Sequence, residues 1–166
     1  MATFDEHISH SKDNLDYLSK INNSINERWD WQVTVCFYSA LHLINAHVVK
    51  KTGKNYLSHS QISNAINPYN SLSISKLDES TFLAYEKLFQ LSRRSRYLLS
   101  ENFKKGDEVE IQPACLTYSK HFKKTICHLN TIVQFISNAY NVEFAITEVI
   151  CIDLNGLTFE NFKIKN

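Results

Sequence analysis

The stretch from Trp31 to Val49, WQVTVCFYSALHLINAHVV, constrains the fold of this 166-residue chain more than any other. It contains no Asp, Glu, Lys or Arg. Placed on a helix it is apolar almost all round, which is typical of a helix packed on several sides. One face carries Tyr38, His42 and Asn45, and an unpaired buried polar group costs about 1–3 kcal/mol. We therefore expect a central helix whose polar face meets polar groups elsewhere in the chain.

A membrane-spanning helix is the alternative for this stretch, because a span takes about 20 mostly apolar residues. Six polar residues make the stretch too polar for that role: Gln32, Thr34, Ser39, His42, Asn45 and His47. The first 20 residues carry charges throughout and contain no apolar block of the kind found in signal peptides. We expect a cytoplasmic protein that makes no contact with a membrane.

Composition narrows the class of protein further. A chain of 166 residues predicts one main core, and only three Gly and two Pro favour long helices over a turn-rich sandwich or barrel. The net charge of +1 provides no overall field for nucleic acid, so a basic function requires a local cluster. The four cysteines are scattered without a CxxC pair, which indicates reduced thiols. No phosphate-binding loop or metalloprotease motif is present, and we predict neither a cofactor nor a metal site.

Apolar residues at three-, four- and seven-residue steps predict an all-α fold, an antiparallel bundle of four or five helices. The expected segments are a first helix over 3–26, the central helix ending near Gly53, a short helix over 59–66 capped by Ser58, a loop over 67–77, a helix from Asp78 or Ser80 to about Glu101, a charged loop over 102–112 and a last helix from Pro113 to Tyr140.

Residues 141–166 change character and form a C-terminal extension to the bundle of residues 1–140. Apolar residues two apart between Ile146 and Leu154, followed by Asn155-Gly156, predict a β-hairpin. A hairpin alone is marginally stable, so it must dock on the bundle or on a partner chain. A terminal helix over 142–153 is the alternative.

The sharpest cluster of charge is the Arg93, Arg94 and Arg96 group, with Tyr97 beside it. Arg96 falls inside an apolar stripe of its predicted helix, and a buried charge requires a partner. The functional interpretation is a contact with phosphate or nucleic acid, which suits the flat guanidinium group. The alternative is a set of salt bridges with some arginines left in solvent. Carboxylates that suit the alternative are Asp16, Glu86 and Glu101.

Two more features of the sequence add to this hypothesis. If the two long helices pack side by side, Tyr38, His42 and Asn45 face the arginine cluster, although a buried histidine in a polar network is more often structural. His59, at the start of a short helix, is placed to bind an anion or to serve as a solvated cap. A second apolar stripe on the arginine-bearing helix favours contact with a partner chain. That stripe consists of Leu83, Leu91 and Leu98.

Four segments resemble HEPN domains: a Trp-bearing helix start, FYSALHLINA, a Leu-Ser-His helix start and YEKLFQLSRRSRY. The resemblance spans about residues 4–140 and is to the stand-alone prokaryotic branch of the superfamily. It implies a four- or five-helix bundle, usually a homodimer, that binds RNA or a nucleotide in a toxin–antitoxin or phage-defence system, with a partner protein encoded nearby.

Many HEPN proteins are metal-independent ribonucleases marked by Arg, four to six residues, then His. This chain departs from that pattern, because no His follows Arg93, Arg94 or Arg96 at that spacing. The resemblance implies that Arg93 and Tyr97 occupy the helix position of the polar motif. A separate hypothesis is that His42, on the neighbouring helix, replaces the missing histidine.

The predicted function is therefore RNA or nucleotide binding, with ribonuclease activity as the reaction that the resemblance implies. In that reaction a 2′-hydroxyl attacks the adjacent phosphate, a neutral His accepts its proton and arginines stabilise the phosphorane. The catalytic candidates are His42, Arg93 and Arg96. The ligand-binding candidates are Tyr38, Asn45, His59, Arg94 and Tyr97. The alternative function is a non-catalytic module for dimerisation or protein interaction.

Overall fold

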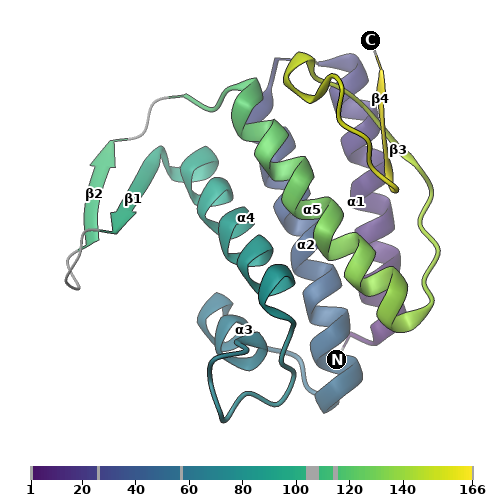
Figure 1. Ribbon diagram of the computed structural model, residues 1–166, viewed down its shortest axis with the longest axis vertical. Coiled ribbons are helices and arrows are strands. Elements are labelled where there is room, and N and C mark those ends of the chain that lie inside the picture. The colour runs from purple at the N-terminus through teal and green to yellow at the C-terminus, as the bar shows by residue number, and fades with distance from the viewer. Residues whose placement is uncertain (1, 26, 57, 104–108, 114–115, 166) are drawn as a thin grey trace.

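The computed structural model describes residues 2–25, 27–56, 58–103, 109–113 and 116–165, with strands 99–103 and 109–113 described by their backbone. The fold is mostly helical, as predicted (Figure 1). Its helices are α1 (Phe4–Ser24), α2 (Trp29–Thr52), α3 (His59–Ile66), α4 (Glu79–Tyr97) and α5 (Ser119–Tyr140). Its strands are β1 (Leu99–Phe103), β2 (Val109–Pro113), β3 (Thr147–Ile150) and β4 (Phe162–Lys165), with a 3₁₀ turn at Ile152–Leu154.

Helix α2 forms the centre of the bundle and packs against α1, α4 and α5. Twelve of its side chains are buried, and it ends where Gly53 turns out of the helix at a φ of 68°. It is also long and apolar enough to cross a membrane, but 67% of its most apolar window is buried inside the fold. A buried core helix meets the same criteria of length and composition, and here α2 plays that part.

The polar face of α2 is less buried than the sequence predicts. Trp31 is 58% exposed and Tyr38 is 40% exposed, whereas His42 and Asn45 are half-buried. The neighbours of this face are α1 on one side and α4 on the other, because His42 contacts α1 and Tyr38 contacts α4. The face therefore lies at the surface, between α1 and α4, while α5 packs against α2 elsewhere.

The helix starts follow their capping residues. Ser58 accepts a hydrogen bond from the backbone N–H of Gln61 while the Gln61 side chain accepts from the Ser58 backbone, and this capping box begins α3 where the sequence predicts it. Asp78 accepts from the backbone N–H of Thr81 at 2.9 Å and caps α4. The predicted boundaries of these two starts are confirmed.

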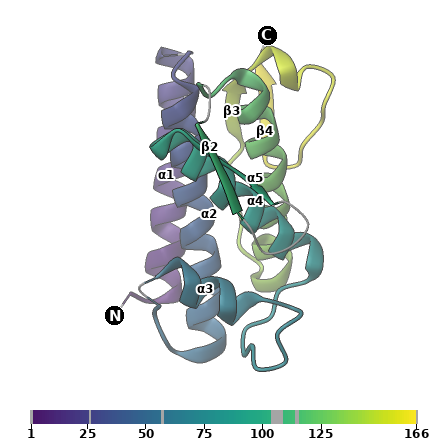
Figure 2. The same ribbon diagram turned by 90° about the vertical axis from the view of Figure 1, so that its left-hand side faces the viewer.

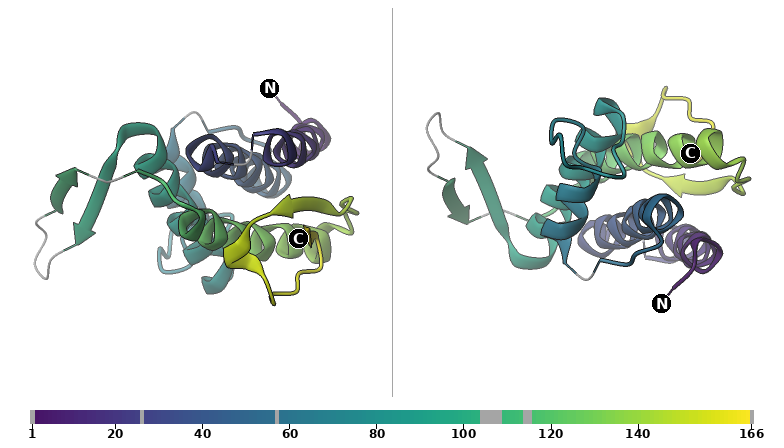
Figure 3. Two further views of the ribbon diagram at one scale, coloured as in Figure 1. Left: turned by 90° about the horizontal axis from the view of Figure 1, so that it is seen from above. Right: turned by 90° about the horizontal axis from the view of Figure 1, so that it is seen from below.

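The predicted end of α4 and start of α5 are wrong. Helix α4 ends at Tyr97 because Leu98 adopts a left-handed conformation with a φ of 53°. Within the segment predicted as helix end and charged loop, β1 and β2 pair antiparallel, with Leu99 opposite Pro113, and residues 104–108 lie outside the described residues. This ribbon projects away from the bundle (Figures 1 and 3). Pro113 thus ends a strand, and α5 begins at Ser119.

The C-terminal extension is neither a hairpin nor a helix over 142–153. Strand β3 pairs with β4 in parallel, and residues 151–161 carry the chain back between them. Asn155 has a φ of −55° and a ψ of 135°, Gly156 has a φ of 81°, and the Leu157 N–H donates to the Leu154 carbonyl. These angles define a type II turn, whereas a two-residue hairpin needs a mirror-image turn.

The extension is held against the bundle beside α1 and α5 (Figures 1 and 2). Val149, Leu154 and Phe162 are buried in the common core. On its α1 side, β3 is paired with side chains instead of a strand. The Asn22 amide donates to the Ile150 carbonyl at 3.1 Å and accepts from the Ile150 N–H at 2.5 Å. An edge that would otherwise be open is thereby covered.

We predict that Asn22→Ala lowers the free energy of unfolding by about 3 kcal/mol, because it removes two hydrogen bonds to partly buried backbone groups of Ile150 and one buried hydrogen bond to Gln32. Urea unfolding followed by circular dichroism measures the change. Asn23→Ala is the matched control, since Asn23 is exposed and bonds only within α1. Equal effects of the two substitutions would contradict the role given to Asn22.

Candidate nucleic-acid interface between α2 and α4

Arg96 is the centre of the candidate site. Its guanidinium carbon lies 5.5 Å from the ring centre of Phe37, 5.8 Å from that of Tyr38 and 5.0 Å from that of Tyr97. Its Nη1 is 3.5 Å from the Tyr38 hydroxyl, and its Nε and Nη2 donate to the carbonyl and hydroxyl of Ser92. These contacts place a half-buried cation among three aromatic rings.

No carboxylate among the described residues lies within ion-pair distance of Arg96. A salt bridge to Asp16 or Glu86 is therefore not what holds this side chain, and the side chain of Glu101, the third candidate, lies outside the described residues. Cation–π contacts and hydrogen bonds to neutral groups stabilise the guanidinium without cancelling its charge. The positive charge of Arg96 remains available to an anion.

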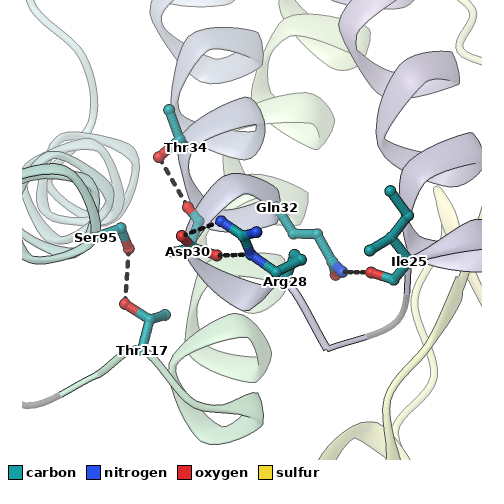
Figure 4. Close-up of polar contacts among 7 residues, drawn as sticks. All are labelled: Ile25, Arg28, Asp30, Gln32, Thr34, Ser95 and Thr117. Atoms are coloured by element: carbon teal, nitrogen blue, oxygen red, sulfur yellow. Dashed lines mark hydrogen bonds and ion pairs between the residues drawn. The ribbon is translucent and has the colours of Figure 1, made fainter.

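A cleft of about 230 Å³ adjoins Arg96, between the start of α2 and the end of α4. Its lining consists of Asp30, Trp31, Thr34, Ser95 and Arg96. Figure 4 shows two walls of this region, with Asp30 and Thr34 on α2 facing Ser95 on α4. Ser95 shares a 3.2 Å hydrogen bond with Thr117, which ties the end of α4 to the segment before α5 (Figure 4).

The acid in the cleft is already paired. Asp30 accepts hydrogen bonds from Arg28 at 3.2 and 3.3 Å (Figure 4). Partial burial favours a higher pKa for Asp30, but the hydrogen bonds from Arg28 and from backbone N–H groups outweigh it, and the pKa is lowered overall. Asp30 is thus ionised and partly neutralised by Arg28, so it opposes an anion at Arg96 less than a free carboxylate does.

Exposed aromatic side chains lie in the cleft wall and around Arg96. Trp31 lines the cleft and is 58% exposed, and the two rings that contact Arg96 from α2 and α4, Tyr38 and Tyr97, are 40% and 57% exposed. Proteins that bind single-stranded nucleic acids combine aromatic side chains with cations. The bases stack on the aromatic rings, and the phosphates contact the cations. The geometry therefore suits a nucleotide or a short stretch of RNA.

His59 lies near this cluster on α3. Its ring centre is 4.8 Å from that of Phe89 and 5.5 Å from that of Phe37. Burial, together with the nearby charge of Arg96, lowers the pKa of His59, so the imidazole is neutral at pH 7. Its Nδ1 is buried without a hydrogen-bond partner. From the sequence, His59 is expected to bind an anion at the start of α3 or to be a solvated cap, and its position near Arg96 could not be read from the sequence.

His42 does not join the arginine cluster through any of its described contacts. Its Nδ1 is 3.1 Å from the Nδ1 of His7, and its ring centre is 4.1 Å from that of His10. Both partners lie on α1, and the expectation that His42 faces the arginines is corrected accordingly. Sequence reasoning gave His7 and His10 no role, and their three-residue spacing was the only signal for a shared face.

Asn55 fixes the protons in this histidine cluster. Its Nδ2 donates to the Ala2 carbonyl, so its Oδ1 accepts from His7 Nε2 at 3.0 Å. Neutral His7 then carries a lone pair on Nδ1, and His42 must donate to it from its own Nδ1. Burial and the neighbouring His10 and His7 lower the pKa of His42 to about 4. No group of side chains in the described part of the chain is arranged to hold a metal ion.

The remaining candidates are spread around the two helices. Arg93 lies 5.8 Å from the ring centre of Phe89, on the His59 side. Arg94 is two residues from Arg96 and so points to the other side of α4, where its charge acts on His121 of α5. Asn45 is half-buried on α2 and makes no side-chain hydrogen bond with a described residue. Of the predicted residues, Tyr38, Tyr97 and Arg96 are brought together, with His59 nearby.

Comparison with known proteins adds no assignment: the chain matches no family model, and no curated protein or solved structure is significantly similar to it.

The lowered pKa of His42 predicts a loss of stability in mild acid. The unfolded chain, with an ordinary His pKa of 6.5, binds more protons than the fold between pH 6.5 and about 4, so stability falls as the pH drops through this window. His42→Asn removes this proton uptake, and we expect its unfolding midpoint in urea to fall less than that of the wild type. Asn45→Ala is the control and should keep the wild-type pH dependence; a wild-type curve for His42→Asn would contradict the assignment.

Proposed function

We propose that this chain is a HEPN-like cytoplasmic protein that binds single-stranded RNA or a nucleotide in the cleft between α2 and α4. The observation that carries the proposal is Arg96, a half-buried cation with no described carboxylate partner, set among aromatic rings at the edge of a cleft. Buried charge is costly unless it is paired, and a phosphate supplies the missing partner. The resemblance to HEPN domains of prokaryotic defence and toxin–antitoxin systems supports the same ligand class.

The contacts divide between charge and stacking. The guanidinium group of Arg96 offers N–H donors to a phosphate, while Trp31, Tyr38 and Tyr97 offer faces to bases. Stacking on aromatic rings tolerates any base, because every base has a π-face. The hydroxyls of Thr34 and Ser95 already donate to backbone carbonyls of their own helices, so few groups remain to read base edges. We therefore propose binding with little sequence preference.

Binding is favoured over cleavage as the function of this site. The chain lacks the Arg-to-His spacing of HEPN ribonucleases, and the described contacts of His42 are with α1. His59 is a neutral histidine near Arg96, but its Nδ1 is buried next to aromatic rings, where it is poorly placed to accept a proton from RNA. Incubation of the protein with labelled RNA in the presence of EDTA tests this choice, and metal-independent cleavage would contradict it.

A homodimer is the second candidate function, and a different surface favours it. A groove of about 360 Å³ lies between α1 and α2. It is next to the α2–α4 cleft, because Trp31 lines both. The groove is lined by Tyr17, Ile21, Ile25, Arg28, Trp31, Gln32 and Val35. Its side chains at Tyr17, Ile25 and Trp31 are more than half exposed, and exposed apolar patches commonly mark interfaces. We propose a second copy of the chain as its occupant.

Arg96→Ala should weaken binding of a short single-stranded RNA about tenfold, since a charge-assisted hydrogen bond contributes about 1.5–3 kcal/mol. Arg96→Lys keeps the charge but loses the planar fork, and should bind with intermediate affinity. Fluorescence anisotropy at several salt concentrations measures both, and Lys54→Ala is the control that removes an exposed cation beyond the far end of α2. If the wild type shows no salt-sensitive RNA binding, the proposal is wrong and the alternative function, a non-catalytic module for dimerisation or protein interaction, takes its place.

Ile25→Glu should convert the dimer to a monomer, because it places a charge among the apolar side chains that line the groove. Sedimentation equilibrium of the wild type and the variant measures the change. Ile152→Glu is the matched control, since Ile152 is 79% exposed in the C-terminal extension. A monomeric wild type at micromolar concentrations would rule out the dimer.

A further inference from the structure

Cations gather on the side of α4 that faces away from Arg96. Lys87 and Arg94 lie on α4 seven residues apart, about 10 Å along the helix. The adjacent helix α5 contributes Lys120 and Lys124, and it packs directly against α4 (Figure 1). The lysines are exposed and Arg94 is half-buried. His121 and His128 complete this set of six residues, which we call the α4–α5 basic face.

The charged groups that act on the two histidines of the basic face are cations. Burial, as the largest cause, and the charges of Arg94, Lys120 and Lys124, in that order of effect, together lower the pKa of His121 to about 4. Burial also lowers the pKa of His128, with Lys87 and Lys124 as the next causes. Every charged group that acts on these two imidazoles is a cation, and both imidazoles are neutral at pH 7.

The three lysines of the basic face are not balanced by acids among the described residues. No described carboxylate lies within ion-pair distance of Lys87, Lys120 or Lys124. The nearest partner of Lys87 is the side-chain carbonyl of Gln90 at 3.4 Å, and Lys120 lies over the ring of Tyr118. For a chain with a net charge of +1, this is a strong local separation of charge. Like charges held together repel each other, and an anionic partner removes that cost.

We propose that the α4–α5 basic face binds the phosphodiester backbone of an RNA strand that continues beyond the α2–α4 cleft. This inference rests on the proposed RNA binding at Arg96. Arg94 and Arg96 lie in the same turn at the end of α4 and point to opposite sides of it. A strand that passes over the end of α4 therefore meets the cleft first and the basic face next. The negative charge of the phosphates suits both positive surfaces, and a single strand is flexible enough to bend over the end of α4.

A length-dependent binding experiment separates the two surfaces. The probes are a short oligouridylate of about 4 nucleotides, which fills the cleft, and a long one of about 16 nucleotides, which reaches the basic face. The variant Lys87→Gln/Lys124→Gln removes two exposed cations from the face. Lys51→Gln/Lys54→Gln is the matched control, because it removes two exposed lysines near the opposite end of α2.

For the long RNA we expect Lys87→Gln/Lys124→Gln to raise Kd about tenfold at low salt and to reduce the salt slope by about 1.4, since each phosphate contact in a single strand contributes about 0.7. The short RNA should bind unchanged, and the control variant should bind both RNAs as the wild type does. Arg96→Ala should weaken binding of both RNAs.

The outcomes distinguish this inference from the proposed function. If Arg96→Ala weakens binding of both RNAs but Lys87→Gln/Lys124→Gln leaves the long one unchanged, the basic face is not a backbone site and the cleft stands. If the control variant weakens long RNA equally, net charge explains the binding and the inference is overturned. If the wild type binds neither RNA, both fail. Lysine-dependent binding to phosphatidylserine vesicles in that case identifies the face as a membrane contact.

Discussion

The burial of α2 against three other helices is the constraint on which the rest of the structure depends. Helices α1, α4 and α5 all pack on it, and this explains why nineteen residues, 31–49, contain no charged side chain. Three helices cannot enclose a fourth completely, and the strip that faces between α1 and α4 stays open to solvent. The residues there, Trp31, Tyr38 and His42, are aromatic or polar instead of aliphatic. The candidate site therefore occupies the part of the central helix that the bundle leaves uncovered.

The helices were predictable because their signals are local. Periodic apolar residues mark α1 and α5, a long stretch without charged residues marks α2, and the Ser58–Gln61 capping box fixes the start of α3. The errors arise where the backbone departs from the usual residue preferences. Leu98 ends α4 in a left-handed conformation without the glycine that normally announces it. Asn155-Gly156 forms a type II turn, so a dipeptide typical of hairpins connects parallel strands.

The candidate site was predictable only in part, and the reason is the rotation of neighbouring helices. Arg96 could be singled out from the sequence because it falls within an apolar stripe of its helix. In the structure, aromatic rings surround its guanidinium group. The helical period gives the direction of a side chain relative to its own axis, but it does not say which neighbour lies there. The sequence therefore assigned His42 to the arginines, whereas its contacts are with His7 and His10 on α1. The basic face between α4 and α5 was missed for the same reason, since its residues come from two helices.

The end of α4 explains how the fold tolerates Arg96 without a carboxylate partner among the described residues. The unpaired carbonyls of a helix C-terminus carry partial negative charge, which stabilises a nearby cation by about 0.3–1 kcal/mol. Arg94 and Arg96 lie in the last turn of α4, and Arg96 Nε also donates to the Ser92 carbonyl. Unlike an ion pair with a carboxylate, these interactions hold the side chain while leaving most of its charge unneutralised. The same helix end thus supports both surfaces, since it directs Arg96 to the aromatic cleft and Arg94 to the lysines beside α5.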